Sequence, residues 1–251
     1  MSRPIRAFIN CAALRHNLAV VRRHVHQARI MAVVKADAYG HGLLRVARAL
    51  DAVDGFAVLE LEAAIQLREA GFNQPILLLE GFFSIEEIEA IDHYRLNTVI
   101  HCHEQLSMLL AHKKTGKPDI FLKINTGMNR LGFRPEEGNS VLNRLRQWHT
   151  DISITLMTHF ACADDLLEAD HVDQQLGNFA RLEEKREGCI PRTLANSAAI
   201  LRYPGTHADW VRPGIILYGA SPLPDKTGIE LGLQPVMTLT SRIIAVQHLD
   251  F

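Results

Sequence analysis

The feature that most constrains this chain is a repeated alternation of short apolar runs with longer amphipathic segments. Several of the runs are apolar almost throughout, which is typical of parallel strands buried on both faces. Eight strands are expected, over residues 31–35, 55–59, 75–79, 97–101, 119–124, 152–159, 193–195 and 211–218. Eight strand–helix alternations predict an α/β fold of the (β/α)₈ TIM-barrel type, with an open doubly wound sheet as the alternative.

Helical signals lie between these runs. An opening helix is indicated by one apolar stripe, formed by Leu14, Leu18, Val21 and Val25. A helix over residues 61–70 is expected to end at Gly71, and Pro135 is expected in the first turn of another helix. Residues 164–188 are predicted to form a long polar helix that buries Leu176, Phe179 and Leu182.

The pattern changes after Pro235. Residues 236–246 favour β-structure, and no helix follows before the chain stops at Phe251. A strand without a partner is not a stable end for a domain. We therefore expect a barrel domain over residues 1–234, and over residues 235–251 the first strand of a truncated C-terminal β domain.

Charge and cysteine content exclude several classes of function. A formal net charge of −1 provides no field that would attract nucleic acid or an anionic membrane. The four cysteines are scattered without a C-x-x-C pair, which argues against a metal site and favours reduced thiols. Neither a signal peptide nor an apolar run long enough to span a bilayer is evident. The sequence therefore predicts a cytoplasmic protein without a metal.

Polar residues gather where five of the expected strands end. Barrel enzymes keep their catalytic groups at the C-terminal ends of strands, so this concentration predicts an active site. Lys35 closes the apolar run 32–34, and its stem is therefore expected to be buried. Burial disfavours the ammonium form, as a Schiff-base lysine requires. The alternative is a lysine that extends from the barrel rim into solvent.

Five segments resemble the alanine racemase family, in the order and spacing of that family. They are VVKADAYGHG at 33–42, LKINTGMNRLGF at 122–133, THF at 158–160, ANS at 195–197 and WVRPGIILYG at 210–219. The resemblance implies an enzyme dependent on pyridoxal 5′-phosphate that interconverts L-alanine and D-alanine by two-base proton transfer. It also implies a role in supplying D-alanine for peptidoglycan, and the sequence leaves a catabolic role open as the alternative.

The same resemblance assigns residues to the cofactor. Lys35 would hold it as a Schiff base and act as one of the two bases. The phosphate would be bound by Tyr39, Ser197 and the backbone N–H groups of Gly214 and Ile215, and Asn196 would belong to this site as well. Loops after the last two strands of a barrel are a common phosphate site, and glycine permits a close backbone approach.

Four further residues have roles by resemblance. Arg212 would face the pyridine nitrogen and keep it unprotonated, because arginine does not give up its proton. Arg130 would contact the phenolic oxygen of the cofactor and approach the substrate carboxylate. His159 would stack along the ring and donate toward Arg212. Lys123 matches a lysine that is carbamylated in many relatives, where the carbamate orients the arginine that corresponds to Arg130.

The match is incomplete at one point. Family members take their second base, a tyrosine, from a C-terminal domain across a dimer interface, and no tyrosine here matches it: the four are Tyr39, Tyr94, Tyr203 and Tyr218. We therefore expect a fragment of a homodimeric racemase that racemises alanine weakly or not at all by itself. Three alternatives are a single-barrel pyridoxal-phosphate homeostasis protein, an amino-acid decarboxylase of the same barrel class, and a barrel that binds a ligand without chemistry.

Overall fold

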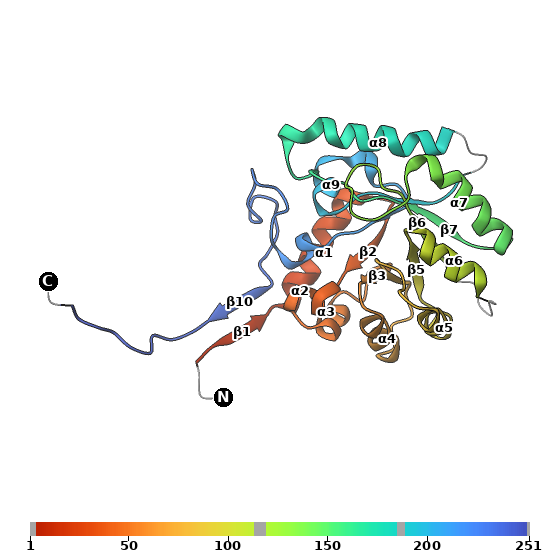
Figure 1. The fold of residues 1–251 in the computed structure, drawn as a ribbon. Helices are drawn as coiled ribbons and strands as arrows, with labels where there is room; N and C mark the ends of the chain where they lie inside the picture. The colour runs from red at the N-terminus through yellow and green to blue at the C-terminus, as the bar shows by residue number, and fades with distance from the viewer. Residues whose placement is uncertain (1–3, 113–118, 185–188, 250–251) are drawn as a thin grey trace.

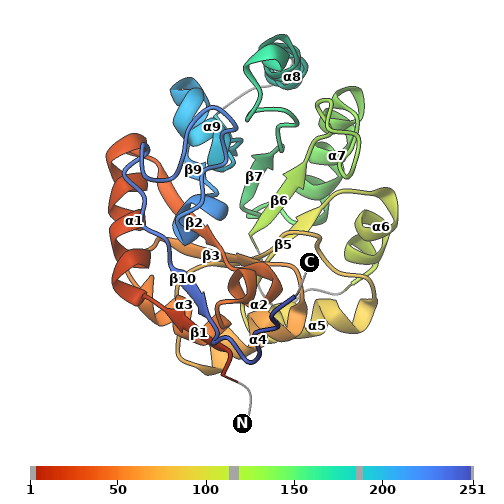
Figure 2. The ribbon, with the colours of Figure 1, turned by 90° about the vertical axis from the view of Figure 1, so that its left-hand side faces the viewer.

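A closed barrel of eight parallel strands forms the centre of the molecule. The computed structural model describes residues 4–112, 119–184 and 189–249, except for the side chains of residues 183 and 184. Strand β9 pairs with β2 and closes the ring, so the (β/α)₈ prediction is confirmed against the open sheet (Figure 2). The ring consists of β2 (Arg29–Val33), β3 (Gly55–Val58), β4 (Ile76–Leu78), β5 (Asn97–Ile100), β6 (Ile120–Lys123), β7 (Ile154–Met157), β8 (Arg192–Thr193) and β9 (Trp210–Val211).

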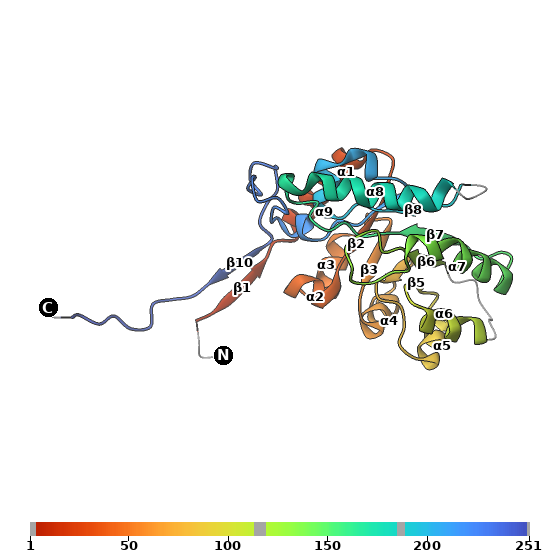
Figure 3. The ribbon, with the colours of Figure 1, turned by 45° about the horizontal axis from the view of Figure 1, so that its top comes forward.

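Helices surround the barrel, as Figures 1 and 3 show from two sides. They are α1 (Cys11–Val25), α2 (Lys35–Gly40), α3 (Leu43–Ala49), α4 (Leu61–Glu69), α5 (Ile85–His93), α6 (His103–Ala111), α7 (Pro135–Trp148), α8 (Ala169–Glu184) and α9 (Ser197–Arg202), with short 3₁₀ turns at η1 (Leu166–Glu168), η2 (Pro204–Thr206) and η3 (Ile215–Tyr218). No helix in the described ranges is both long and apolar enough to cross a membrane.

The helix predictions are confirmed in most details. The predicted stripe of α1 is buried, Pro135 is the first residue of α7, and Gly71 follows α4 with a φ of +92°. The long helix α8 begins later than expected, at Ala169, because the Asp165 side chain accepts a hydrogen bond from Leu167 and caps the turn η1 instead. Residues 185–188 of the predicted span lie outside the described residues.

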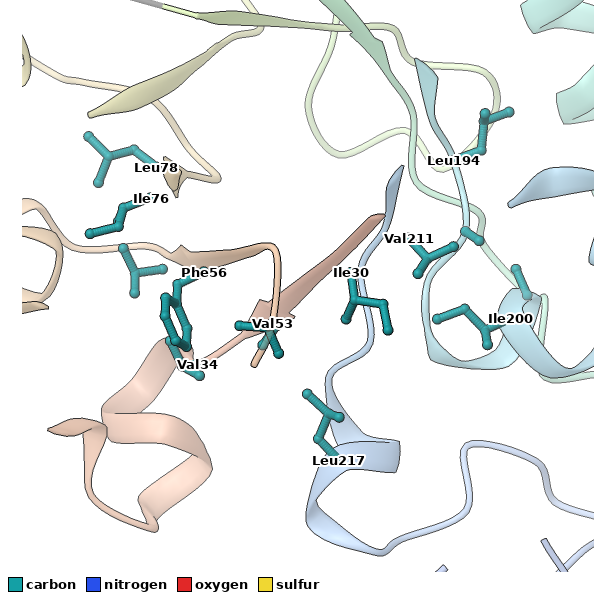
Figure 4. Packing of buried hydrophobic residues seen from close by; sticks show 14 of the residues in the cluster. Ile30, Val34, Val53, Phe56, Ile76, Leu78, Leu194, Ile200, Val211 and Leu217 are labelled. Carbon is teal, nitrogen blue, oxygen red and sulfur yellow. The ribbon is translucent and has the colours of Figure 1, made fainter. Parts of the chain in front are cut away.

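Side chains alternate between two apolar layers along each strand, as the twofold period of β-structure requires. The inner layer fills the barrel with Met31, Val33, Ala57, Leu77, Val99, Phe121, Met157 and Trp210. The outer layer packs against the helices and includes Ile30, Val34, Phe56, Ile76, Leu78 and Val211 (Figure 4). This alternation decides which residues beyond the strand ends face the mouth of the barrel.

The prediction of a strand over residues 211–218 is wrong. Strand β9 ends at Val211, and Ile215–Tyr218 forms the 3₁₀ turn η3. Pro213 has no N–H group to donate to a neighbouring strand, which stops the hydrogen-bond ladder. An apolar run alone does not distinguish a buried strand from a buried turn.

The prediction that the C-terminal strand has no partner is also wrong. Strand β10 (Met237–Thr240) pairs antiparallel with β1 (Arg6–Ile9), a strand absent from our expectations. This two-stranded sheet projects from the barrel, and the residues after β10 continue away from it (Figure 1). All four residues of β10 are exposed. The assignment of residues 235–251 to a second domain stays a prediction.

Candidate active site

Strand periodicity brings four of the predicted site residues to the mouth of the barrel. Each of them follows a residue of the inner layer by two positions and therefore points to the same side. The four pairs are Val33 and Lys35, Phe121 and Lys123, Met157 and His159, and Trp210 and Arg212. These four side chains line a cavity of about 400 Å³.

The same cavity contains the rest of the predicted site. Its lining also includes Tyr39, Arg130, Asn196, Ser197, Gly214 and Ile215. Two carboxylates that the sequence analysis missed, Glu80 and Asp164, line it too. Glu80 directly follows the expected strand 75–79, so its position at a strand end was a usable signal. The structure thus brings every predicted site residue into one place.

Lys35 begins a left-handed turn that leads into Tyr39. The four residues Ala36 to Tyr39 all have φ between 51° and 54°, and none of them is glycine. Left-handed backbone costs roughly 1–2 kcal/mol for each such residue, so the surrounding contacts must hold this turn in place. Lys35 is half-buried in the cavity wall rather than extended from the rim into solvent, although it is less buried than we expected.

Tyr39, Ser197 and Gly214 meet at one corner of the cavity. The Gly214 N–H donates a 2.9 Å hydrogen bond to the Ser197 hydroxyl. A Cβ atom on Gly214 would lie 2.5 Å from the Tyr39 hydroxyl oxygen, so a larger residue there would displace Tyr39. Burial raises the pKa of Tyr39, which keeps its hydroxyl a hydrogen-bond donor at neutral pH. This corner brings together the Tyr39 and Ser197 hydroxyls and the Gly214 amide, groups that suit the oxygens of a phosphate.

Asn196 fixes the backbone next to this corner. Its side chain accepts a 3.0 Å hydrogen bond from the Ala199 N–H and donates one of 3.3 Å to the Phe160 carbonyl. It therefore caps helix α9, which begins at Ser197, and ties the start of this helix to the loop after β7. Asn196 therefore both lines the cavity and positions Ser197.

Arg212 is a buried cation held by neutral partners. Its guanidinium donates to the carbonyls of Thr158 at 2.6 Å and Leu194 at 3.2 Å, and to the Thr193 hydroxyl. Burial lowers its pKa to about 9, which leaves the group charged at neutral pH. None of these three partners carries a formal charge, so none of them neutralises the positive charge of Arg212.

The other basic groups of the cavity respond to this charge. Burial lowers the pKa of Lys123 to about 8, with further lowering by Arg212 and Arg130. Burial lowers the pKa of His159 to about 3, again reinforced by Arg212 and by Lys123. His159 is therefore neutral at pH 7. We expected it to donate toward Arg212, but a guanidinium has no acceptor, so any bond between the two requires His159 to accept.

Arg130 lies on an ordered loop at the rim. The Asn125 side chain accepts from the N–H groups of Gly127 at 3.1 Å and Asn129 at 3.0 Å, which folds the loop back on itself. Gly132 has a φ of +124°, and a Cβ there would lie 2.5 Å from the Asn125 nitrogen. Arg130 itself is exposed. A cation on a rigid loop above a cavity can receive an anionic group from solvent.

Comparison with known proteins agrees with this geometry. The sequence profile described as "Alanine racemase, N-terminal domain" matches residues 9–222. The alanine racemase of Nitrosomonas europaea is 98% identical over 251 residues, which are 100% of this chain and 69% of that protein. The chain belongs to the alanine racemase family. The predicted resemblance is confirmed, ahead of the homeostasis-protein and decarboxylase alternatives.

Solved structures of alanine racemases have the same fold. The enzyme from Acinetobacter baumannii superposes with a TM-score of 0.92 at 39% identity, covering 99% of this chain and 69% of that one. The biosynthetic alanine racemase from Pseudomonas aeruginosa gives a TM-score of 0.90 at 43% identity, covering 94% of this chain and 66% of that one. These racemases thus contain the barrel described above, and their chains also include sequence that this chain does not cover.

Proposed function

We propose that this chain is the pyridoxal-5′-phosphate-binding barrel of an alanine racemase, with Lys35 as the residue that carries the cofactor. One observation supports this assignment most: the Lys35 amine and the corner formed by Tyr39, Ser197 and Gly214 line the same cavity. A lysine and a phosphate site in one cavity are what an aldehyde-bearing phosphate ester requires. Family membership supplies the substrate, L- or D-alanine.

The bound cofactor would supply an aldehyde that condenses with an amine with loss of water, and an electron-withdrawing ring that acidifies the α-carbon of the amino acid. Lys35 would provide that amine. Once the amino group of alanine has taken its place on the aldehyde carbon, the freed Nζ atom would accept or return the α-proton. Tyr39, Ser197 and the backbone of Gly214 and Ile215 bind the phosphate, which orients the ring. Asn196 keeps Ser197 in position.

Arg212 would meet the ring nitrogen. Its charge at neutral pH, and its neutral partners on the protein, support this role. A cation at that position disfavours protonation of the nitrogen, so the ring withdraws electrons less strongly than it would beside a carboxylate. Such tuning suits simple proton exchange at the α-carbon. Neutral His159 would lie along the ring and accept a hydrogen bond from Arg212.

Arg130 would bind the carboxylate of alanine and the phenolic oxygen of the cofactor. Its position on the rigid rim loop supports this role. Lys123, whose pKa is lowered to about 8, has more free amine at neutral pH than an ordinary lysine and can react with carbon dioxide. The resulting carbamate would replace a buried cation by an anion that orients Arg130.

A second base on the opposite face of the substrate is needed for rapid racemisation. All four tyrosines are in the described residues, and among them Tyr39 alone lines the cavity, where it faces Gly214. We therefore infer that the 251-residue chain by itself racemises alanine weakly or not at all. Racemisation by the purified chain at a rate comparable to that of a full-length relative would contradict this inference.

The cellular role we infer is the supply of D-alanine for peptidoglycan by a cytoplasmic homodimer. The names of the relatives support the reaction, and the sequence that they have beyond this chain supports a second domain and its dimer interface. Two measurements test the role on the full-length protein: growth of a D-alanine auxotroph that expresses it, and its mass by analytical ultracentrifugation. A monomer with full activity would contradict the dimeric part.

Cofactor binding by the chain itself is the direct test of this function. Wild-type protein mixed with pyridoxal 5′-phosphate is expected to absorb above 400 nm, and borohydride reduction with peptide mapping should label Lys35. Lys35→Ala should lose both signals, whereas Lys226→Ala, which changes an exposed lysine, should keep them. An unlabelled Lys35 in the wild-type protein would refute the assignment and favour a barrel without this chemistry.

A further inference from the structure

The left-handed turn after Lys35 is held mainly by two residues that do not line the cavity, Asp37 and His41. The Asp37 carboxylate accepts a 2.7 Å hydrogen bond from the Leu43 N–H, and the Asp37 carbonyl accepts one of 2.9 Å from the Gly42 N–H. Both bonds join the turn to the start of α3. They therefore fix where the turn ends, just as β2 fixes where it begins.

His41 holds the same turn from its inner side. Its Nδ1 atom lies 2.9 Å from the Tyr39 carbonyl and 3.1 Å from the Ala38 carbonyl, so this nitrogen carries the proton and donates. The His41 ring packs on Tyr218 at 4.7 Å between centroids, and Tyr218 packs on Tyr39 at 4.6 Å. The Tyr218 hydroxyl donates to the Val33 carbonyl at 3.1 Å. Through Tyr218, His41 thereby connects the turn to Val33, which precedes it, and to Tyr39, which ends it.

Asp37 faces away from the cavity. It lines a shallow outer groove beside α1 and α3, and its side chain is exposed. It can therefore influence the cofactor site only through the backbone that joins Lys35 to Tyr39. The turn has strained dihedral angles at four successive residues, so loss of a bond that holds it favours relaxation of the backbone.

We propose that Asp37 is a positioning residue of the cofactor site, which acts with His41 to hold the left-handed turn that presents Lys35 and Tyr39 to the cavity together. This inference rests on the proposed cofactor function. It extends that function to a residue which touches neither the cavity nor its contents. Asp37 contributes through one acceptor oxygen, not through its charge.

The test compares binding of pyridoxal 5′-phosphate by variants of the 251-residue chain. Asp37→Ala removes the acceptor and is expected to weaken binding about tenfold or more, and to lower the fraction of Lys35 labelled by borohydride. Asp37→Asn keeps an acceptor oxygen without the charge and should bind within about threefold of wild type. Asp51→Ala, which changes an exposed aspartate beyond α3, is the matched control and should bind as wild type does.

A second substitution separates positioning from general stability. Ala36 has a left-handed backbone and is exposed, and glycine adopts that conformation without strain. Ala36→Gly in the Asp37→Ala background should therefore recover part of the lost affinity and labelling. If Asp37→Ala alone does not fold, this double variant takes its place and should still bind at least threefold more weakly than wild type.

Three results decide the matter. Binding and Lys35 labelling by Asp37→Ala within twofold of wild type would overturn the positioning role and leave the cofactor function intact. Equal weakening by Asp37→Asn and Asp37→Ala would also overturn it, because the charge would then matter instead of the acceptor. A wild-type chain that neither absorbs above 400 nm nor labels at Lys35 would overturn the cofactor function, and the positioning role with it.

Discussion

The Tyr39 hydroxyl occupies the space into which a side chain on Gly214 would project, since a Cβ atom there would lie 2.5 Å from the hydroxyl oxygen. Carbon and oxygen cannot approach so closely, so any larger residue at position 214 must displace Tyr39. Tyr39 is packed against Tyr218 with 4.6 Å between ring centroids, which limits how far it can move. The corner formed by Tyr39, Ser197 and Gly214 therefore requires a glycine at position 214.

Gly214→Ala should weaken binding of pyridoxal 5′-phosphate by tenfold or more, because Tyr39 is pushed out of the corner. Equilibrium dialysis against the cofactor measures this directly. Gly205→Ala is a suitable control, since nothing lies within 4 Å of a Cβ at that position, and it should bind normally. Unchanged affinity in Gly214→Ala would show that Tyr39 contributes little to the phosphate site.

Arg212→Lys should destabilise the barrel even though the charge is retained. An ammonium cannot reach the carbonyls of Thr158 and Leu194 and the Thr193 hydroxyl in the planar arrangement of a guanidinium. Buried acceptors left without donors cost about 1–3 kcal/mol each, so a loss of roughly 2–4 kcal/mol in the free energy of unfolding is expected. Urea denaturation measures it, and a loss below about 0.5 kcal/mol would contradict the expectation.

The pH dependence of stability should report Lys123. Its pKa falls from the ordinary 10.5 to about 8 on folding, so between these pH values the unfolded chain binds more protons than the folded one. The free energy of unfolding should therefore rise by up to roughly 3 kcal/mol between about pH 8 and about pH 10.5. At and below pH 8 this contribution from Lys123 is at its lowest. Lys123→Met should lack this rise when the two proteins are denatured in urea across that range in nitrogen-purged buffer. Parallel curves for the two proteins would contradict the pKa shift.

Carbon dioxide should modify Lys123 in the wild-type protein. A carbamate forms from the free amine, so bicarbonate is expected to produce a ¹³C signal from labelled carbamate in wild-type protein and none at this position in Lys123→Met. The signal should grow as pH rises toward and above 8, because the free amine becomes more abundant. No difference between the two spectra would exclude the modification at Lys123.

Arg68 should be important for the stability of the fold away from the site. Its guanidinium donates to four backbone carbonyls, those of Tyr94, Phe72, Gln74 and Arg95, at 2.6–3.0 Å. Arg68→Met leaves these acceptors to water or unpaired, and a loss of about 2–3 kcal/mol is expected. For a chain of this size the melting temperature should fall by roughly 4–10 °C, measured by circular dichroism. Arg48→Met, at an exposed position of α3, should change it little.

Most of the candidate site could be predicted before the fold was known. The five segments supplied the residue roles by resemblance, and the apolar runs supplied the order of the strands. Once the strands are placed in a barrel, a period of two carries Lys35, Lys123, His159 and Arg212 to the mouth. Glu80 does not follow this period, because the inward residues at β4 are Leu77 and Leu79, and no recognised segment includes it.

What the sequence by itself determined is local: the apolar period that buries each strand and helix, and the identity of the groups at the strand ends. The tertiary structure alone decided two things. These are the pairing of β10 with β1 and the left-handed turn from Ala36 to Tyr39. The strand pairing joins residues more than two hundred positions apart, which no local pattern records. The turn opposes the backbone preference of its own residues, and contacts from Leu43 and Tyr218 overcome that preference only in the closed barrel.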